Sequence, residues 1–478
     1  MIKSAFKYSL PAFLSLIFFS CKKDQFIEDP GAKLSFSKDS VLFDTVFTTI
    51  GSTTKYFKVY NNNNQRINIS NIRLAKGSAS QFRFNADGVY GTSINNIEID
   101  AKDSIFVFIE VTVNPNQATS PLVIRDSLLF ETNGNIQDID LEAWGQDAYF
   151  HLPDNKIVFS SGGALYYGIE PCSAQWLSDK PHVVYGYRVV DSTCVLSIDA
   201  GSKIYFHNNA GIWVYRYGTI KVNGTLSQPV VFQGDRLEPE YADVPGQWDR
   251  IWINEGSTQN IINYAIIKNG FIGLQHEPII DASVPLKVTI SNTIIQNMSG
   301  WGMFAIHGNI SGYNNLICNC GKNLLAVLNG GKYSFTHCTF TNFYTQTERT
   351  DPIIFLNNHD EVNGLVPLDS AYFGNCIIDG NQTEEIAFDS IPGGFNFKFE
   401  GSMLKTSIPL AGSKFPNCFQ NKSNSYVNPA VYNFKIQQNS WAIDRGIPAI
   451  GNLFPLDLNG KSRISDAAPD IGSYEYQP

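Results

Sequence analysis

The sequence lacks several features that define common classes of protein. No run of about 18 apolar residues, the length a helix needs to cross a bilayer, occurs after residue 21. No apolar stripe recurs at the 3.6-residue spacing of an amphipathic helix, which argues against a helical bundle. Lysine and arginine are scattered rather than clustered, and the formal net charge is −9. This distribution excludes nucleic acid as an expected partner.

The eight cysteines do not have the spacing of a metal site. No pair resembles a zinc ribbon, so we expect no bound metal. Cys172 and Cys194 flank one segment and could be bridged in an oxidising compartment. Cys338 and Cys376 occupy the same slot in consecutive repeats, which favours two stacked free thiols.

What the chain does contain is one short phrase that occurs five times. Each copy has an apolar opener, a small polar residue, an apolar pair and a closing Asn or Gly, at 262–269, 290–297, 312–319, 335–342 and 373–380. A second strand-like pattern lies between copies, at 271–275, 303–307, 324–328, 353–356 and 385–388. A repeat in the low twenties predicts stacked coils of parallel strands, with the closing asparagines at one corner. A β-propeller is the alternative, but its blades need about 40–50 residues each.

The remaining segments predict an all-β chain with further parts. Residues 32–147 hold alternating strands of six to nine residues between Asn, Gly and Pro turns, which is typical of an antiparallel sandwich. We interpret this segment mainly as a spacer. A connector (148–193) leads into the coils (194–401), and residues 402–478 are expected to cap them.

Two resemblances refine this fold. The elements SIDAGSKIYF, GTIKVNGT and PVVF, within 197–232, resemble the first coils of right-handed β-helix proteins of the pectate-lyase-like superfamily. Residues 32–147 resemble the immunoglobulin-like modules of bacterial surface proteins. Together they imply an N-terminal immunoglobulin-like β-sandwich followed by a right-handed parallel β-helix with a C-terminal cap. They do not imply a reaction, because that superfamily includes lyases, hydrolases, esterases and adhesins.

The first 21 residues resemble a bacterial lipoprotein signal peptide. Lys3 and Lys7 precede an apolar core, and Ser20 stands before Cys21. The following Lys-Lys-Asp and the order of domains resemble surface-exported β-helix lipoproteins of Bacteroidetes. This resemblance implies acylation of Cys21, a tether over 22–31 and a location at the outer membrane, on the cell surface, with membrane attachment through the lipid anchor only.

Candidate site residues lie on insertions between the strands, because the strands themselves are used for packing. Residues 234–247 and 343–351 both leave one strand row and enter the next, so they should emerge at the same corner, four coils apart. The candidates for catalysis are Asp235, Asp243 and Asp249, and those for binding are Asp235, Arg236, Tyr241, Arg349 and Asp351.

We expect these residues to recognise an extracellular polysaccharide or a surface partner. The alternative is a polysaccharide lyase or glycoside hydrolase, which would place two carboxyl groups about 5–9.5 Å apart across a bond. A third alternative is a structural adhesin or stalk without a groove. Asp457, Asn459 and Gly460 resemble part of a calcium loop, but its distal Glu is missing, so no cofactor is expected.

Overall fold

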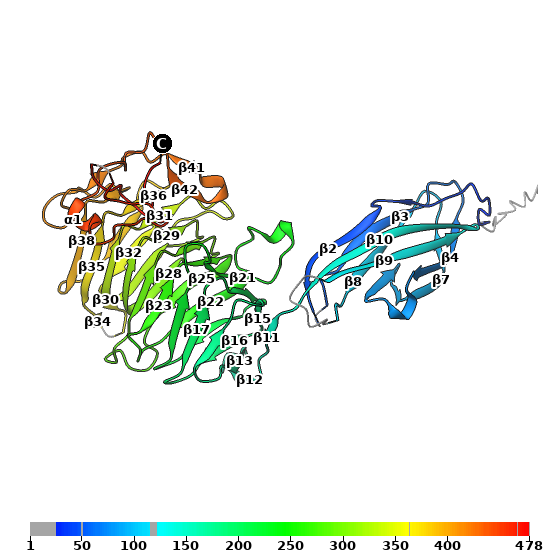
Figure 1. Cartoon of the computed structure of the whole chain (residues 1–478), viewed down its shortest axis with the longest axis horizontal. Coiled ribbons are helices and arrows are strands. Elements are labelled where there is room, and N and C mark those ends of the chain that lie inside the picture. Colours follow the sequence, from blue (N-terminus) through cyan, green and yellow to red (C-terminus); the bar gives the residue numbers. More distant parts are fainter. Residues whose placement is uncertain (1–24, 49–50, 115–121, 363, 466, 478) are drawn as a thin grey trace, which may run out of the picture. The chain divides into compact units, whose positions relative to one another are not determined.

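The computed structural model describes residues 25–48, 51–114, 122–362, 364–465 and 467–477. The expected signal peptide, Cys21 and the start of the tether lie outside the described residues. The described elements are 42 strands, three short 3-10 helices and one turn of α-helix, α1 (Pro448–Gly451), which confirms the all-β class. None of the described helices has the length and apolar character needed to cross a membrane. The chain divides between Gln146 and Asp147 into two compact units (Figure 1).

The first unit consists of two five-stranded sheets. One sheet has the order β1 (Ser35–Phe36), β3 (Lys55–Tyr60), β8 (Ser104–Val111), β5 (Phe82–Ala86) and β6 (Val89–Gly91). The other has the order β2 (Ser40–Phe47), β10 (Asn135–Gln146), β9 (Leu122–Thr132), β4 (Ile67–Leu74) and β7 (Ser93–Ile99). All neighbours pair antiparallel except β10 and β2, which run parallel. Alternating side chains from both sheets, such as Phe57, Ile69, Val107 and Leu128, form one buried core.

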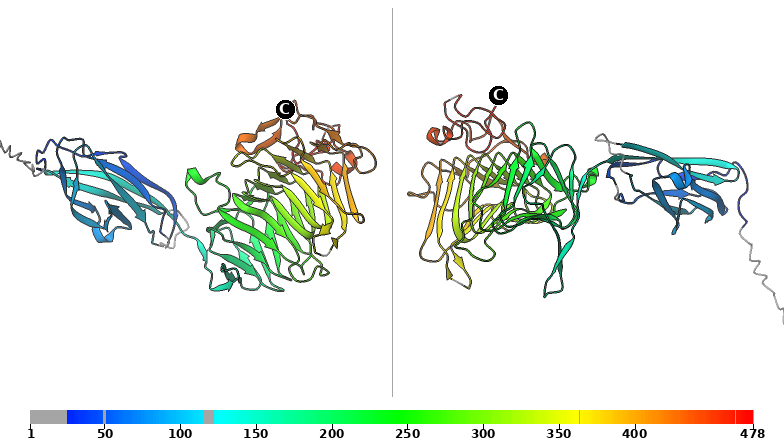
Figure 2. Two further views of the ribbon diagram at one scale, coloured as in Figure 1. Left: turned by 180° about the vertical axis from the view of Figure 1, so that it is seen from behind. Right: turned by 60° about the horizontal axis from the view of Figure 1, so that its bottom comes forward.

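The second unit is built from stacked coils, each returning the chain to the same rows of parallel strands (Figure 2). The first row contains β13 (Ala164–Ile169), β16 (Tyr187–Val190), β19 (Gly211–Val214), β22 (Trp248–Ile253), β25 (Gly270–His276), β28 (Met303–Tyr313), β30 (Leu325–Thr336), β32 (Ile354–Asn357) and β37 (Ile386–Asp389). The second row contains β14 (Ala174–Trp176), β17 (Val195–Asp199), β20 (Thr219–Asn223), β23 (Asn260–Asn263), β26 (Val288–Ser291), the later halves of β28 and β30, β35 (Leu368–Gly374) and β38 (Phe395–Glu400). The third row contains β11 (Tyr149–His151), β15 (His182–Val184), β18 (Lys203–Phe206), β21 (Val230–Gly234), β24 (Ala265–Lys268), β27 (Ile294–Gln296), β29 (Leu316–Cys318), β31 (Thr339–Asn342), β36 (Ile377–Gly380), β39 (Met403–Leu404) and β40 (Phe419–Gln420).

The repeated phrase supplies the second and third rows in register. Ile267 faces Ile295, which faces Ile317, and each of these side chains is fully buried. Burying one such side chain stabilises the fold by roughly 1.5–3 kcal/mol. The repetition of these positions from coil to coil therefore produces one continuous core.

The closing asparagines form the expected corner. Asn269, Asn297 and Asn319 have left-handed backbone, with φ of 63°, 57° and 50°, a conformation that Asn tolerates better than most residues. Asn297 Nδ2 donates to Asn269 Oδ1 at 2.8 Å. Asn342 instead donates to the carbonyl oxygen of Cys320, at 2.9 Å. Some hydrogen bonds of the asparagine ladder therefore join two side chains, and others join a side chain to a backbone carbonyl.

The coils extend beyond the expected limits at both ends. Residues 148–193 were expected to be a connector, but β11 pairs with β15 and β13 with β16 in the same parallel pattern. At the other end β39 pairs in parallel with β40. The early coils lack the repeated phrase, so their membership is not visible in the sequence. An antiparallel strand, β12 (Asn155–Val158), pairs with β13 at the first coil.

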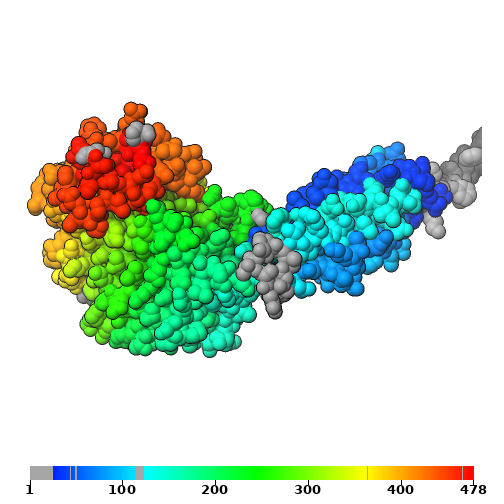
Figure 3. All heavy atoms as spheres, viewed as in Figure 1, coloured from blue at the N-terminus to red at the C-terminus, as the bar shows by residue number. Residues whose placement is uncertain are grey.

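Two parts of the C-terminal segment pack on two different surfaces of the coils. Phe415 packs on Phe397 and Phe399 of the last coil, with ring centroids 5.7 and 5.8 Å away. Later residues, including Tyr426, Phe434 and Ile471, instead bury the outward side of the third row, around Leu316 and Ile377. Figure 3 shows this orange-to-red segment lying against the green and yellow coils. Most of the expected cap is therefore a cover along one side of the coils.

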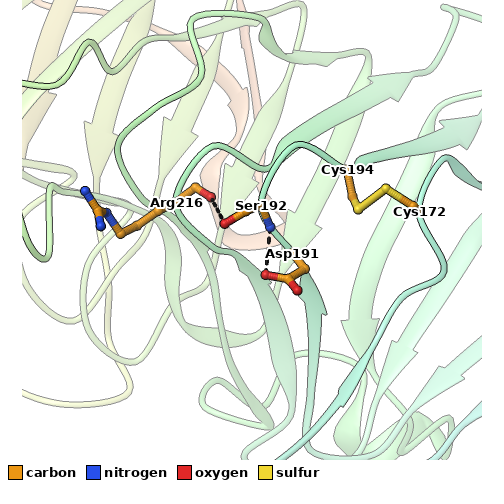
Figure 4. Close-up of a disulfide and its surroundings, with 5 residues drawn as sticks. All are labelled: Cys172, Asp191, Ser192, Cys194 and Arg216. Atoms are coloured by element: carbon orange, nitrogen blue, oxygen red, sulfur yellow. Dashed lines mark hydrogen bonds between the residues drawn. A yellow bond between two sulfur atoms is a disulfide. The ribbon is translucent and has the colours of Figure 1, made fainter.

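One disulfide links two early coils. Cys172 and Cys194 are joined, with their Cα atoms 4.6 Å apart (Figure 4). Next to it, Ser192 Oγ donates to the backbone oxygen of Arg216 at 2.9 Å. Cys338 and Cys376 are buried free thiols, as expected from their shared slot in the repeat.

Candidate functional site

The loop 234–247 stands out from the coils (Figure 1), and its later part contacts the asparagine corner. It joins β21 to β22 and contains a short 3-10 helix, η2 (Pro239–Tyr241). Asn269 Nδ2 donates to the backbone oxygen of Ala242 at 2.8 Å, and Asn297 Nδ2 donates to that of Asp243 at 2.9 Å. The corner ladder thereby holds the loop across successive coils.

Asp235 forms a dyad with a histidine that the sequence did not single out. His207 Nδ1 lies 2.8 Å from Asp235 Oδ2, and this hydrogen bond raises the pKa of His207. The ring of Tyr185 stacks on the imidazole with centroids 4.5 Å apart. His207 Nε2 has no hydrogen-bond partner among the described residues. A carboxylate that orients an imidazole in this way is a common general-base arrangement.

Arg236 and Tyr241 contact each other. The guanidinium carbon of Arg236 lies 3.7 Å from the centroid of the Tyr241 ring, a cation–π distance. Arg236 Nε also lies 3.2 Å from Glu238 Oε2. The two predicted binding residues are therefore neighbours, but the cation is already paired within its own loop.

Asp249 belongs to a closed polar network on the outward face of the first row. It accepts hydrogen bonds from Tyr187 and Arg250, and burial together with this carboxylate raises the pKa of Tyr187. Arg250 donates in turn to Gln275, and Gln275 Nε2 donates to Glu277 at 2.8 Å. Every charged group in this chain of contacts has a partner.

Two tryptophans on the same face also pack and hydrogen-bond within the protein. Trp213 and Trp252 stack ring on ring, 4.8 Å apart and 12° from parallel, so one face of each ring is covered by the other. Trp252 Nε1 donates to Glu277 at 2.9 Å. Burial raises the pKa of Glu277. We interpret this face as a structural ladder. Two of the carboxylates predicted for catalysis have separate partners: Asp235 pairs with His207, whereas Asp249 pairs with Tyr187 and Arg250.

Arg349 is buried, although the sequence predicted it as an exposed binding residue. Its side chain is 1% exposed and donates to both carboxylate oxygens of Glu385, at 2.6 and 2.8 Å. It also donates to the backbone oxygen of Asp351 at 2.7 Å. The guanidinium is therefore inside the fold, where it holds the loop 343–351 in place and has no open surface for a ligand. Asp351 remains partly exposed beside it.

A pocket of about 410 Å³ lies at the same corner, and we call it the corner pocket. Its lining residues come from the loop 234–247, the asparagine ladder, the loop 343–351 and the C-terminal cover: Asp243, Asn297, Asn319, Phe343, Tyr344, Thr345, Gln346, Pro429, Ala430 and Tyr432. The two insertions expected to share this corner therefore line one cavity. The contribution of residues 429–432 was not predicted, because nothing in the sequence places the tail beside these loops.

The aromatic side of the corner pocket is held in an unusual conformation. Tyr432 follows the 3-10 helix η3 (Pro429–Val431), between β41 (Tyr426–Asn428) and β42 (Asn433–Ile436), with a left-handed φ of 58°. A non-glycine residue in this region is strained, and such residues gather at functional sites. Burial raises the pKa of the Tyr432 hydroxyl, and the nearby Asp243 carboxylate raises it further.

The polar side of the corner pocket has unused hydrogen-bonding capacity. Asn319 Oδ1 accepts from the Phe343 backbone at 2.8 Å, but its amide nitrogen has no partner among the described residues. The Asp243 carboxylate and the Gln346 amide likewise form no hydrogen bond within the described chain. Asn297 Oδ1 is buried without a partner. The polar groups of the corner pocket are therefore available to hydrogen-bond a ligand, whereas those of the Asp249 network are already paired with one another.

The described residues contain no cluster of three or more His, Cys, Asp or Glu side chains that could hold a metal ion. In the loop that resembles part of a calcium site, Asp457 forms hydrogen bonds within the protein. Asp457 accepts hydrogen bonds from the backbone nitrogens of Asn459, Lys461 and Glu475, at 2.8, 2.6 and 2.8 Å. Its carboxylate therefore ties a turn of the C-terminal cover together.

Comparisons with known proteins are weak. No protein family and no curated protein matches the chain. Among solved structures, the catalytic unit of a GH87 α-1,3-glucanase from Streptomyces thermodiastaticus is similar over 73% of this chain and 79% of its own, at 11% identity and a TM-score of 0.27. A PapD-like domain of human CEP192 is similar over 31% of this chain and 99% of its own (9% identity, TM-score 0.18). A family 123 glycoside hydrolase from Clostridium perfringens covers 25% of this chain and 31% of its own (7% identity, TM-score 0.18). Scores this low carry no functional argument.

Proposed function

We propose that the second unit binds a sugar residue of an extracellular polysaccharide in the corner pocket. The observation that carries this proposal is the set of unpartnered polar groups of Asp243, Asn319 and Gln346 beside the rings of Tyr344 and Tyr432. Sugars present hydroxyl groups on their edges and apolar C–H groups on their faces. A concave site with aromatic walls and a few polar groups suits such a ligand.

The proposal extends to the architecture and location of the chain. The in-register parallel rows support a right-handed parallel β-helix, and the two facing sheets support an immunoglobulin-like sandwich. We propose acylation at Cys21 and residence at the outer membrane, facing the cell surface, from the sequence pattern alone. Replacing Cys21 with Ser should release the protein from the membrane fraction, and unchanged association would contradict the anchor. The proposed binding requires no metal or other cofactor.

The test is retention of the purified chain on a panel of immobilised neutral and acidic polysaccharides. The variant Asp243→Ala/Gln346→Ala should bind about tenfold more weakly, as expected when roughly 1.4 kcal/mol of polar contact is lost. Glu240→Ala is the matched control, because Glu240 is exposed in the same loop but does not line the pocket. Retention of no polysaccharide, or equal retention by the double variant and wild type, would overturn the proposal.

A second function, cleavage of the polysaccharide, is favoured by one observation. The His207–Asp235 dyad leaves Nε2 of the imidazole unpartnered among the described residues, on a side chain that is 51% exposed. A base in that position could remove a proton from a bound sugar or from water. Release of new reducing or unsaturated ends by wild type, lost in His207→Ala with retention unchanged, would establish this activity. Release of no such ends leaves binding as the function.

A further inference from the structure

The first unit carries a cluster of aromatic rings that its fold does not bury. Tyr56, Phe106 and Phe108 are 53%, 42% and 40% exposed on the outward face of the sheet that contains β3 and β8. Their ring centroids lie 5.7 to 6.0 Å apart. The core of this unit is closed on the other side of the sheet. Clustered apolar side chains left in solvent mark an interaction surface.

Two lysines lie over these rings. Lys58 Nζ is 4.6 Å from the centroid of Phe106, and Lys38 Nζ is 5.9 Å from that of Tyr56. Neither ammonium group is ion-paired among the described residues, since the ion pairs of this unit all use arginine. The face therefore combines apolar surface with unneutralised positive charge, on a chain whose formal net charge is −9.

A groove of about 400 Å³ continues this face. Its lining includes Phe108, Tyr90, Asn85 and Glu110. Tyr90 is 59% exposed, and its hydroxyl donates to Glu110 at 3.1 Å. Asn85 accepts from the backbone of Gly88 at 2.9 Å but leaves its amide nitrogen without a partner among the described residues. The groove thus adds hydrogen-bonding groups beside the rings and falls within the size range of small-ligand sites.

We propose that this face, formed by Tyr56, Phe106, Phe108, Lys38 and Lys58, binds an acidic polysaccharide. The C–H faces of the sugar rings pack on the aromatic side chains, and uronate or sulfate groups lie near the two ammonium groups. A polyanion is repelled by the net negative charge of the chain, so it needs a local pair of uncompensated cations such as this one.

Other classes of partner fit this face less well. Lysine is depleted at the buried centre of protein–protein interfaces, whereas here two lysines lie directly over the exposed rings. Nucleic acid binding relies on many phosphate contacts from clustered cations, and this face offers two. The inference concerns a unit other than the one that contains the corner pocket, and it stands whether or not that pocket binds sugar.

The test is affinity electrophoresis of the full purified chain through gels that contain polygalacturonate, with neutral dextran as the uncharged reference. We expect retardation by polygalacturonate only. Raising the salt to about 0.5 M should reduce it, because exposed charges are then screened within a few ångströms. Lys38→Gln/Lys58→Gln and Phe106→Ala/Phe108→Ala should each weaken binding about tenfold. The first variant removes the two charges that face the acidic groups of the ligand, and the second removes two of the rings on which its sugars pack. Lys33→Gln/Lys435→Gln removes two exposed lysines elsewhere and should bind as wild type does.

Several outcomes would overturn this inference. Retardation that is unchanged in Lys38→Gln/Lys58→Gln, or that is equal in neutral dextran, would exclude a charge-selective site here. A concentration-dependent dimer of wild type that is lost in Phe106→Ala/Phe108→Ala would show that the face joins two copies of the chain. Thermal melts of each variant verify folding, and the lysine variant keeps the test decisive if the phenylalanine variant is unstable. Loss of acidic binding in Asp243→Ala/Gln346→Ala alone would instead assign that binding to the corner pocket.

Discussion

Arg349 and Glu385 form a two-point ion pair in the interior of the second unit. The two guanidinium nitrogens lie 2.6 and 2.8 Å from the carboxylate oxygens, and both side chains are essentially unexposed. A further bond, from Arg349 to the amide oxygen of Asn381 at 2.6 Å, fixes the same guanidinium. Because these groups are removed from water, each depends on the others for its hydrogen bonds.

Removing one partner of this pair should strongly destabilise the protein. Glu385→Ala leaves a buried, unpaired guanidinium, and the expected loss in the free energy of unfolding is about 3–5 kcal/mol. Chemical denaturation followed by circular dichroism measures this loss. Arg445→Ala is the control, because Arg445 is an exposed arginine of the same unit and should change stability by less than about 1 kcal/mol. A loss below about 1 kcal/mol for Glu385→Ala would mean that the pair is open to water.

The asparagine ladder should hold the loop 234–247 in place. Asn297→Ala removes the bonds to Asp243 and Asn269 and puts alanine where φ is 57°. We expect a loss of about 2 kcal/mol from the two bonds and the strained backbone. Limited proteolysis should then cut within 234–247 faster than in wild type. Asn297→Gly relieves only the backbone strain, so it should recover part of the stability but not the protection of the loop. Equal cleavage rates in all three proteins would show that the ladder does not anchor the loop.

The disulfide should contribute to stability mainly by constraining the unfolded chain. Cys172 and Cys194 are separated by 22 residues, and closing a loop of this length is worth about 3 kcal/mol in the chain-entropy view. Cys172→Ser/Cys194→Ser should lose about that much in denaturant unfolding. Wild type in reductant should match the variant, and a reductant effect on the variant itself would point to another cause.

The repeated phrase predicted most of the second unit because each copy places the same side chains on the same row. Ile267, Ile295 and Ile317 could be aligned from the sequence and do stack. Early coils such as the one containing β15 lack the phrase, since their strands are anchored by other side chains, and they were read as a connector. Periodicity reveals packing only where the packing residues themselves repeat.

The corner pocket was only partly predictable. Asp243 was a candidate, since a long loop in a repetitive fold is a common place for function. Tyr432 was not, because its approach depends on how the C-terminal cover packs, a contact across almost 200 residues. Arg349 was misread as a surface charge, because its partner Glu385 belongs to the following coil. Long-range pairing of this kind leaves no local pattern in a single sequence.

Buried histidines should make the second unit sensitive to acid, and His276 gives the sharpest test. It lies in register between Ile253 and Ala305 on the inner side of the first row, and burial lowers its pKa from 6.5 to about 3. Because the unfolded histidine binds a proton more readily than the folded one, this group favours unfolding once the pH falls below about 6.5. The loss approaches 1.4 kcal/mol for each pH unit down to about pH 3.

His276→Leu should therefore reduce this acid sensitivity. Leucine matches the apolar neighbours in the row, so the variant should be more stable than wild type by about 2 kcal/mol at pH 5 and should differ least at pH 7. Denaturant unfolding at several pH values measures how the free energy of unfolding of wild type and of the variant depends on pH. His207→Gln is the control with the opposite sign, since Asp235 raises the pKa of His207, and stability from that pair is present at low pH and lost as the pH rises. Parallel pH profiles for wild type and His276→Leu would show that His276 is not the buried neutral group described here.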